Sequence, residues 1–237
     1  MKEAGALNVS NPVEGRSVYF KKIDGILYGN DSKNGYFYNN NFIHLDIGLK
    51  FTIPRDFAVQ NNPKNVVATN DSSYLIFDGI EIKQSTTPTN FIRNNYSGYK
   101  KLEKIEANTI EAATAYIGNQ NYQGKNLSAR VVIYAWKKDY YFRFYFLYPS
   151  DISKDLVKSF NDTIYSFQRI SDDEKNTYKP LRIKIVNVGE GIKVSDIASR
   201  MDIEEKAEKY FRLLNGMRSD DELIKGQKVK IVIRSEY

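Results

Sequence analysis

The run YYFRFYFLYP, residues 140–149, restricts the possible folds more than any other part of this chain. Successive side chains of a strand point to opposite faces, so each face receives alternate residues. One face receives Tyr140, Phe142, Phe144, Phe146 and Tyr148, and the other Tyr141, Arg143, Tyr145 and Leu147. Such continuous hydrophobicity is typical of a central strand, which we expect helices to cover on both sides. The alternative is that one face is a stacking platform for sugar rings or an apolar peptide. Trp136, at the end of the preceding strand, is the residue that we expect to be partly exposed.

The neighbouring segments predict an antiparallel sheet with two packed helices, an α+β sandwich similar in element order to Mog1/PsbP-like proteins. Apolar residues alternate from Ile43 to Ile53, where Gly48 can split the strand into a hairpin. Thr87 and Pro88 suit the N-cap and first position of a helix that Gly98 can close. A second helix has Ser150 or Ser153 as its cap and an apolar stripe of Leu156, Val157, Phe160 and Ile164. Further strands are expected at SYLIFDGIEI, KLEKIEA, IEAATAYI and LSARVVIYAW.

A change of composition after residue 170 predicts a second domain. The segment SDDEKNTYKP, 171–180, is polar, charged and closed by Pro180, which is typical of a linker. Beyond it, LRIKIVNV and QKVKIVIR alternate as strands around two amphipathic helices, which predicts a small β-α-α-β unit. We therefore expect a lead-in at 1–40, a sheet domain at 41–170, the linker at 171–180 and a closing domain at 181–237.

Composition narrows the classes of function. The formal net charge is +6, but basic and acidic residues alternate along the chain, so no one-sided basic stripe for nucleic acid is expected. Cysteine is absent, which excludes disulfides and thiolate metal sites. We find no run of eighteen apolar residues and no signal-peptide pattern near Met1, so we expect no membrane span and, for the chain as written, a cytoplasmic location.

A single histidine limits the chemistry. A zinc protease of the H-E-x-x-H type needs two histidines on one helix face, and His44 is the only histidine, within a strand-like stretch. The chain also lacks a G-x-S-x-G elbow and a phosphate-binding loop, and the acidic runs DDEK and SDDE lack the spacing of a calcium loop. We expect a non-catalytic protein without a metal or cofactor, in which His44 is structural.

The closing domain resembles the LysM module, whose pattern runs V-x-x-G-D-T-L-x-x-I-A, then L-N-G, then L-x-x-G-Q-x-L-x-I. Matching positions are Val188, Gly191, Val194, Ile197, Ala198, Leu214, Asn215, Gly216, Leu223, Gly226, Gln227, Val229 and Ile231. Ile192 and Lys193 stand where the family has Asp-Thr. The resemblance implies binding of N-acetylglucosamine polymers such as peptidoglycan by Gly189, Glu190, Gly191, Ile192, Lys193, Asn215, Gly216 and Met217. Alternatively, the glycines and Asn215 fix turns and contact no ligand.

A wider resemblance covers about Tyr19 to Val232. The segments YFKKIDGILYG, FIHLDIGLKFTIPRDF, NDTIYSFQRI and PLRIKIVNV resemble the region downstream of the catalytic domain in bacterial zinc metalloproteases of metallopeptidase family forty-eight, relatives of HtpX and the CAAX prenyl proteases. This implies a non-catalytic accessory region that docks on the protease domain, its substrate or the cell envelope. It also implies a periplasmic location if the chain derives from an exported protease. A general protein-interaction adaptor is the remaining alternative.

Overall fold

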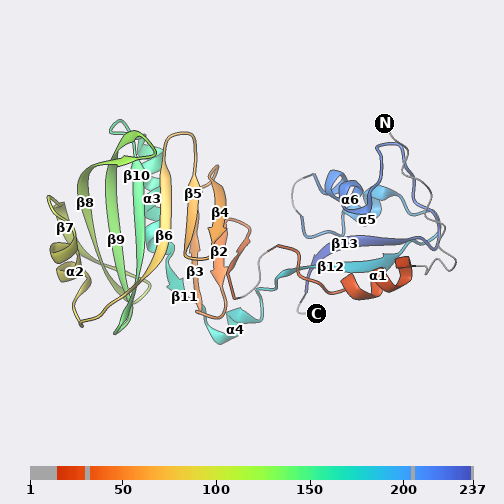
Figure 1. Ribbon diagram of the computed structural model, residues 1–237, viewed down its shortest axis with the longest axis horizontal. Coiled ribbons are helices and arrows are strands. Elements are labelled where there is room, and N and C mark those ends of the chain that lie inside the picture. The colour runs from red at the N-terminus through yellow and green to blue at the C-terminus, as the bar shows by residue number, and fades with distance from the viewer. Residues whose placement is uncertain (1–14, 30–32, 204–205, 236–237) are drawn as a thin grey trace, which may run out of the picture. The chain divides into compact units, whose positions relative to one another are not determined.

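The computed structural model describes residues 15–29, 33–203 and 206–235. The chain forms two compact units (Figure 1). The sheet unit comprises residues 33–178, and the terminal unit combines residues 15–29 with the described residues from 179 to 235. Sheets are antiparallel throughout and helices are few, so the predicted α+β class is confirmed at this level.

A seven-stranded antiparallel sheet forms the body of the sheet unit. Its order is β4 (Ala58–Asn62), β5 (Asn65–Thr69), β6 (Tyr74–Glu81), β10 (Tyr140–Tyr148), β9 (Lys125–Lys137), β8 (Ile110–Tyr122) and β7 (Lys100–Ala107). The aromatic strand β10 therefore has three strands on either side, as the sequence predicts for a central strand. The β8–β9 turn has only Gln123 and Gly124, both at positive φ, which matches the right-handed twist of the hairpin.

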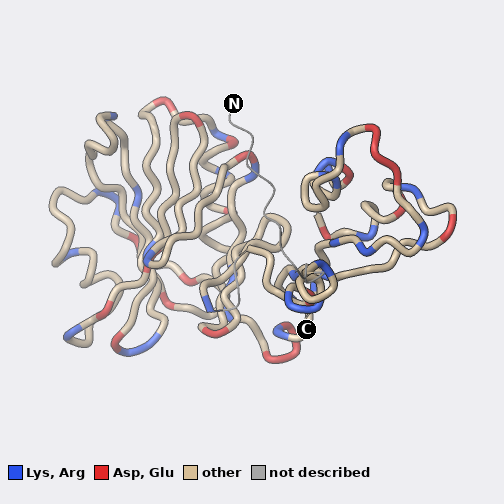
Figure 2. The backbone as a smooth tube through the Cα atoms, turned by 45° about the vertical axis from the view of Figure 1, so that its right-hand side comes forward, with Lys and Arg blue, Asp and Glu red and all other residues tan. Residues whose placement is uncertain are grey.

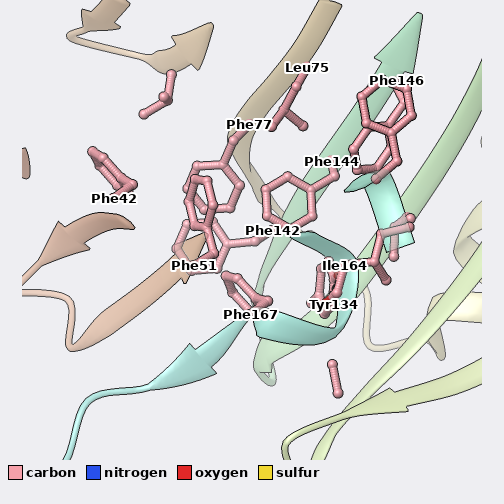
Figure 3. Packing of buried hydrophobic residues seen from close by; sticks show 14 of the residues in the cluster. Phe42, Phe51, Leu75, Phe77, Tyr134, Phe142, Phe144, Phe146, Ile164 and Phe167 are labelled. Carbon is pink, nitrogen blue, oxygen red and sulfur yellow. Dashed lines mark hydrogen bonds between the residues drawn. The ribbon is translucent and has the colours of Figure 1, made fainter. Parts of the chain in front are cut away.

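One face of this sheet packs against a second sheet and a helix. The small sheet has the order β1 (Tyr36–Tyr38), β2 (Asn41–His44), β3 (Leu49–Thr52) and β11 (Gln168–Arg169), and the helix is α3 (Lys154–Ser166). As predicted, Gly48, at φ +78°, splits the alternating run into the β2–β3 hairpin, and Ser153 caps α3. Figure 3 shows the enclosed core, in which Phe51, Phe77, Phe142, Phe144 and Phe167 lie together.

Helix α2 (Pro88–Asn95) packs on the other face. The Thr87 hydroxyl accepts the N–H of Asn90 at 3.2 Å and Pro88 follows it, so the predicted start is confirmed. Ile92 of α2 is buried with Tyr141 and Leu147 of β10, so β10 is covered on both faces.

Two details of these helices differ from the prediction. Helix α2 ends at Asn95, and its C-cap Tyr96 donates its backbone N–H to the carbonyl of Ile92, so Gly98 lies beyond the cap in the following turn. Val157 of α3 is 36% exposed, because the buried stripe of this helix is formed by Phe160, Thr163 and Ile164.

Trp136 is only 3% exposed, so the prediction of partial exposure was wrong. The ring lies edge-on to Phe142 and Phe167, at centroid distances of 5.5 and 5.7 Å. The guanidinium of Arg169 lies 3.8 Å from the ring centroid and donates to the Trp136 carbonyl at 2.6 Å. Trp136 is therefore buried by side chains from other elements, which its position at the end of a strand does not reveal.

The terminal unit has the predicted β-α-α-β order. It contains β12 (Leu181–Asn187), α5 (Val194–Ala198), α6 (Ala207–Asn215) and β13 (Lys228–Arg234), and the two strands form one antiparallel pair. Phe211 of α6 and Val232 of β13 are fully buried in its core.

The predicted lead-in 1–40 does not exist as one segment. Residues 15–29 belong to the terminal unit, and β1 belongs to the sheet unit; residues 1–14 lie outside the described residues. Helix α1 (Gly15–Ile23) leads into an extended segment, where the N–H groups of Gly25 and Tyr28 each donate to β12 carbonyls at 2.8 Å. The free edge of β12 explains this pairing, since its unpaired backbone groups accept a third strand.

The predicted linker 171–180 is largely structured. Ser171 and Glu174 form a capping box on the short helix α4 (Asp172–Lys175). The ammonium of Lys50, on β3, lies 2.5 Å from a Glu174 carboxylate oxygen and donates to the Tyr178 hydroxyl at 3.1 Å. A partly buried ammonium needs acceptors, which holds this polar segment against the sheet unit.

The Lys50–Glu174 pair predicts an acid-sensitive contribution to stability. The hydrogen bond from Lys50 lowers the pKa of Glu174, so this contribution is present above the ordinary glutamate pKa of about 4.3 and is lost as pH falls through the lowered value. We expect Glu174→Gln to reduce the free energy of unfolding by up to about 1 kcal/mol at neutral pH, and by less at an acidic pH where Glu174 is protonated in the folded chain as well. Urea unfolding at both pH values measures this.

The exposed neighbour Asp173 offers a matched control. Asp173→Asn should leave the unfolding free energy unchanged at both pH values. An equal loss for the two variants at neutral pH would contradict the assignment.

Candidate functional site

The first predicted sugar-binding loop, residues 189–193, lies beside the turn at residues 224–227 that precedes β13. Val188, which begins the first loop, exchanges backbone hydrogen bonds of 2.8 Å with Gly226 and Gln227. The ammonium of Lys225 lies 2.6 Å from a Glu190 carboxylate oxygen, and both side chains are exposed. The fold therefore brings the loop that follows β12 to the final part of the loop that precedes β13.

The glycines of these loops adopt the backbone conformations expected of them. Gly191 has φ +70°, Gly226 has φ +82°, and Gly216 ends α6 in the left-handed region at φ +65°. Lys193 is the N-cap of α5 but provides no side-chain cap; its own N–H donates to Asp196 at 2.9 Å. The Asp196 carboxylate therefore orders the loop where the LysM pattern has a polar pair.

Asn215 forms an internal hydrogen-bonded clasp. Its amide nitrogen donates to the carbonyls of Phe211 and Lys230, both at 2.9 Å, and its amide oxygen accepts the Lys230 N–H at 2.7 Å. These bonds join the end of α6 to the middle of β13. Both ends of the Asn215 amide therefore have partners within the protein, and these partners lie on two elements rather than within one turn.

The other residues of the predicted sugar site differ in exposure. Ile192 and Met217 are half-buried and pack on the core of the terminal unit. The accessible members are Gly189, Glu190, Gly191, Lys193 and Gly216. Sugar binding by this set stays a prediction, with the exposed loop 189–193 as its main surface.

His44 has a local role in the β2–β3 hairpin. Its Nδ1 accepts the N–H of Ile47 at 3.3 Å, and its ring lies edge-on to Phe42 with centroids 6.4 Å apart. Over residues 15–29, 33–203 and 206–235, no three His, Asp or Glu side chains gather as potential metal ligands.

The sheet unit has a recess that the sequence did not indicate. It has a volume of about 510 Å³ and lies where the tip of the β2–β3 hairpin meets the ends of β6, β9 and β10. Its lining residues are Ile47, Glu81, Ile82, Lys83, Trp136, Lys137, Asp139, Tyr140 and Phe142. We call this the hairpin recess. Ile47 is 40% exposed, so an apolar side chain is accessible to solvent at this site.

Charges in the hairpin recess are balanced, with two acidic and two basic side chains among its lining residues. Burial, together with Glu81 and Asp78, raises the pKa of Tyr140, so its phenol stays neutral at physiological pH. Gly79 allows this position of the phenol, because a Cβ there would come within 1.8 Å of the Tyr140 oxygen. The recess therefore suits an uncharged, partly apolar group.

The central strand also holds an ion pair on its α2 side. Arg143 donates to both carboxylate oxygens of Asp78, at 3.0 and 2.6 Å, and to the Tyr96 hydroxyl at 3.0 Å. Burial disfavours the charge of Arg143, but these partners outweigh it and raise its pKa. The arrangement fixes the end of α2 to the sheet and leaves no free group for chemistry.

Basic and acidic residues are interspersed along the described chain (Figure 2). None of the helices in the described ranges combines the length and the apolar character that crossing a bilayer requires.

Comparisons with known proteins give distant likenesses only. No protein-family model matches the chain, and no curated protein matches it. A solved protein of Bacteroides thetaiotaomicron VPI-5482 aligns at a TM-score of 0.40 and 11% identity, over 60% of this chain and 50% of its own, so this chain spans about half of that protein. Cyanobacterial PsbP from Synechocystis sp. PCC 6803 aligns at 0.41 and 13%, over 54% of this chain and 91% of its own. LpqN, involved in cell envelope biogenesis of Mycobacterium tuberculosis, aligns at 0.38 and 10%, over 68% of this chain and 100% of its own.

The Asn215 clasp predicts a stability effect confined to the terminal unit. Asn215→Ala leaves both backbone groups of Lys230 without these partners, which we expect to cost about 1–3 kcal/mol. Hydrogen exchange of the intact chain should show faster exchange of the β13 amides and unchanged exchange of the β10 amides.

Leu213→Ala is the control on the same helix, because Leu213 is 75% exposed, and it should change neither set of amides. Unchanged β13 protection in Asn215→Ala would show that the clasp does not stabilise the unit.

Proposed function

We propose that this chain is a non-catalytic docking region that binds a peptide segment of a partner protein in the hairpin recess. The observation that supports it most is an open recess with apolar walls beside a rim of balanced charge. Its volume of about 510 Å³ lies in the range of small-ligand sites. An uncharged side chain of a peptide is the occupant that this lining suits.

The resemblance to the downstream region of family forty-eight zinc metalloproteases supplies the proposed partner. If the chain has the role of that downstream region, its partner is the metalloprotease catalytic domain or a substrate protein, and its location is the periplasm. A Mog1/PsbP-like sandwich acting as a general adaptor would use the same recess with another partner. Both readings need the apolar wall of the recess to be accessible, as Ile47 is.

Trp136 provides a direct readout of this proposal, since it lines the recess and is the single tryptophan of the chain. We expect titration with a tryptophan-free peptide library derived from a family forty-eight catalytic domain to change its emission. Ile47→Asp places a charge on the apolar wall and should weaken binding at least about tenfold.

Val157→Asp is the matched control, because Val157 is about as exposed as Ile47 and lies on α3 outside the recess. It should bind as the parent chain does. Equal weakening by the two substitutions, or emission unchanged by every peptide, would refute docking at this recess.

A second candidate function is peptidoglycan binding by the loops of the terminal unit. The contact between Glu190 and Lys225 supports it, since it holds the exposed loop 189–193 beside the end of the loop that precedes β13. On this proposal the exposed loop 189–193 contacts the sugar and Asn215 only holds the groove together.

A sedimentation assay with purified peptidoglycan tests the second candidate. We expect Glu190→Ala combined with Lys193→Ala to reduce retention at least about fivefold, because both side chains are exposed on the loop. Lys209→Ala, an exposed change on α6, should leave retention unchanged. Retention of the parent chain at background level would exclude the function.

A further inference from the structure

A second recess, in the terminal unit, is lined by hydrogen-bond donors and lacks acidic side chains. It has a volume of about 620 Å³ and lies between helix α1 and the turn that precedes β13. Its lining residues are Arg16, Ser17, Phe20, Ile224, Lys225, Gly226, Gln227 and Lys228. We call this the donor recess. The docking proposal does not use this recess, and the sugar proposal shares only Lys225 with it.

The cations of the donor recess are largely uncompensated. Arg16 and Lys228 are exposed and form no ion pair with any residue that the structure describes. Lys225 pairs with Glu190, but both side chains of this pair are more than two-thirds exposed, so the pair adds little stability and opens readily. The recess therefore presents positive charge to an anion.

Gln227 adds a donor whose direction is fixed. The backbone N–H of Ile224 donates to Gln227 Oε1 at 3.1 Å. Because a backbone N–H can only donate, the accepting atom must be the amide oxygen, and the amide nitrogen is left as a donor. Arginine, lysine, hydroxyl and amide donors around one recess match an oxyanion with several oxygens, such as phosphate, better than a single carboxylate.

An exposed apolar side chain accompanies these donors. Ile224 is 72% exposed and lies next to Lys225 in the chain, while Phe20 is 7% exposed and lies 5.5 Å below the Arg16 guanidinium. A protruding aliphatic residue among cations is an arrangement suited to the boundary between lipid head groups and acyl chains. A soluble phosphate compound gives no reason for Ile224 to face solvent.

We propose that the donor recess binds the phosphate of an anionic phospholipid and so holds the terminal unit at a membrane surface. Arg16, Lys228 and Gln227 contact the phosphate oxygens, Ser17 adds a hydroxyl donor, and Ile224 enters the head-group boundary. Lys225 leaves Glu190 to join them. No membrane-spanning segment is needed for this attachment, which is peripheral and salt-dependent.

Vesicle co-sedimentation of the full chain tests the proposal. At low salt we expect binding to phosphatidylglycerol/phosphatidylcholine vesicles and none to phosphatidylcholine alone. Arg16→Ala with Lys228→Ala should weaken binding about 25-fold, from roughly fivefold for each cation near an anionic surface. Ile224→Ser should weaken it less, at any salt concentration, because its contribution is apolar.

The control is Lys209→Ala with Lys138→Ala, which removes the same charge from exposed positions outside the recess. An equal loss in this control would mean unspecific attraction by net charge and would overturn the proposal. Inorganic phosphate at millimolar concentration should not displace the vesicles. If phosphate displaces the vesicles, or if the chain binds phosphate but no vesicles, the recess binds a soluble phosphate compound instead. Either result would also overturn the proposal.

Discussion

Burial of strand β10 on both faces is the constraint on which the rest of the sheet unit depends. Phe144 on one face and Leu147 on the other are fully buried, and each such side chain contributes about 1.5–3 kcal/mol. A strand with two apolar faces is stable only where other elements pack against both faces of its sheet. The small sheet and α3 pack against one face, and α2 packs against the other. The apolar character of both faces of β10 therefore requires the layers on either side of the large sheet.

Elements with a local signal could be predicted from the sequence. Thr87 and Pro88 mark the start of α2, and Gly48 marks the β2–β3 turn, because each meets a backbone requirement within a few residues. Elements whose structure depends on residues far away in the sequence could not be predicted. The strand β4 (AVQNN) has no clear apolar alternation and forms by pairing with β5, and the 171–178 segment is ordered by Lys50, more than a hundred residues earlier.

The candidate sites show the same division. The left-handed glycines of the terminal unit follow from short motifs, so their conformations were predictable. The hydrogen bonds of Asn215 were not predictable, since they depend on the backbone of Lys230 in another element. The hairpin recess combines Ile47 with residues 81–83 and 136–142, and no local pattern in any one of these segments signals a cavity. Its detection required the register of β6, β9 and β10.

Lys225 links the two proposed surfaces of the terminal unit. In the structure its ammonium pairs with Glu190 of the sugar loop, and the same side chain lines the donor recess. If a phosphate takes this ammonium, the Glu190 carboxylate loses its partner and becomes a free acceptor for sugar hydroxyls. The same separation removes the ion pair that holds loop 189–193 beside residue 225, so the two sites are coupled through this pair, and by thermodynamic linkage each ligand would change the affinity for the other by the same factor. The exposure of the pair keeps this factor small, because a solvated ion pair costs little to separate.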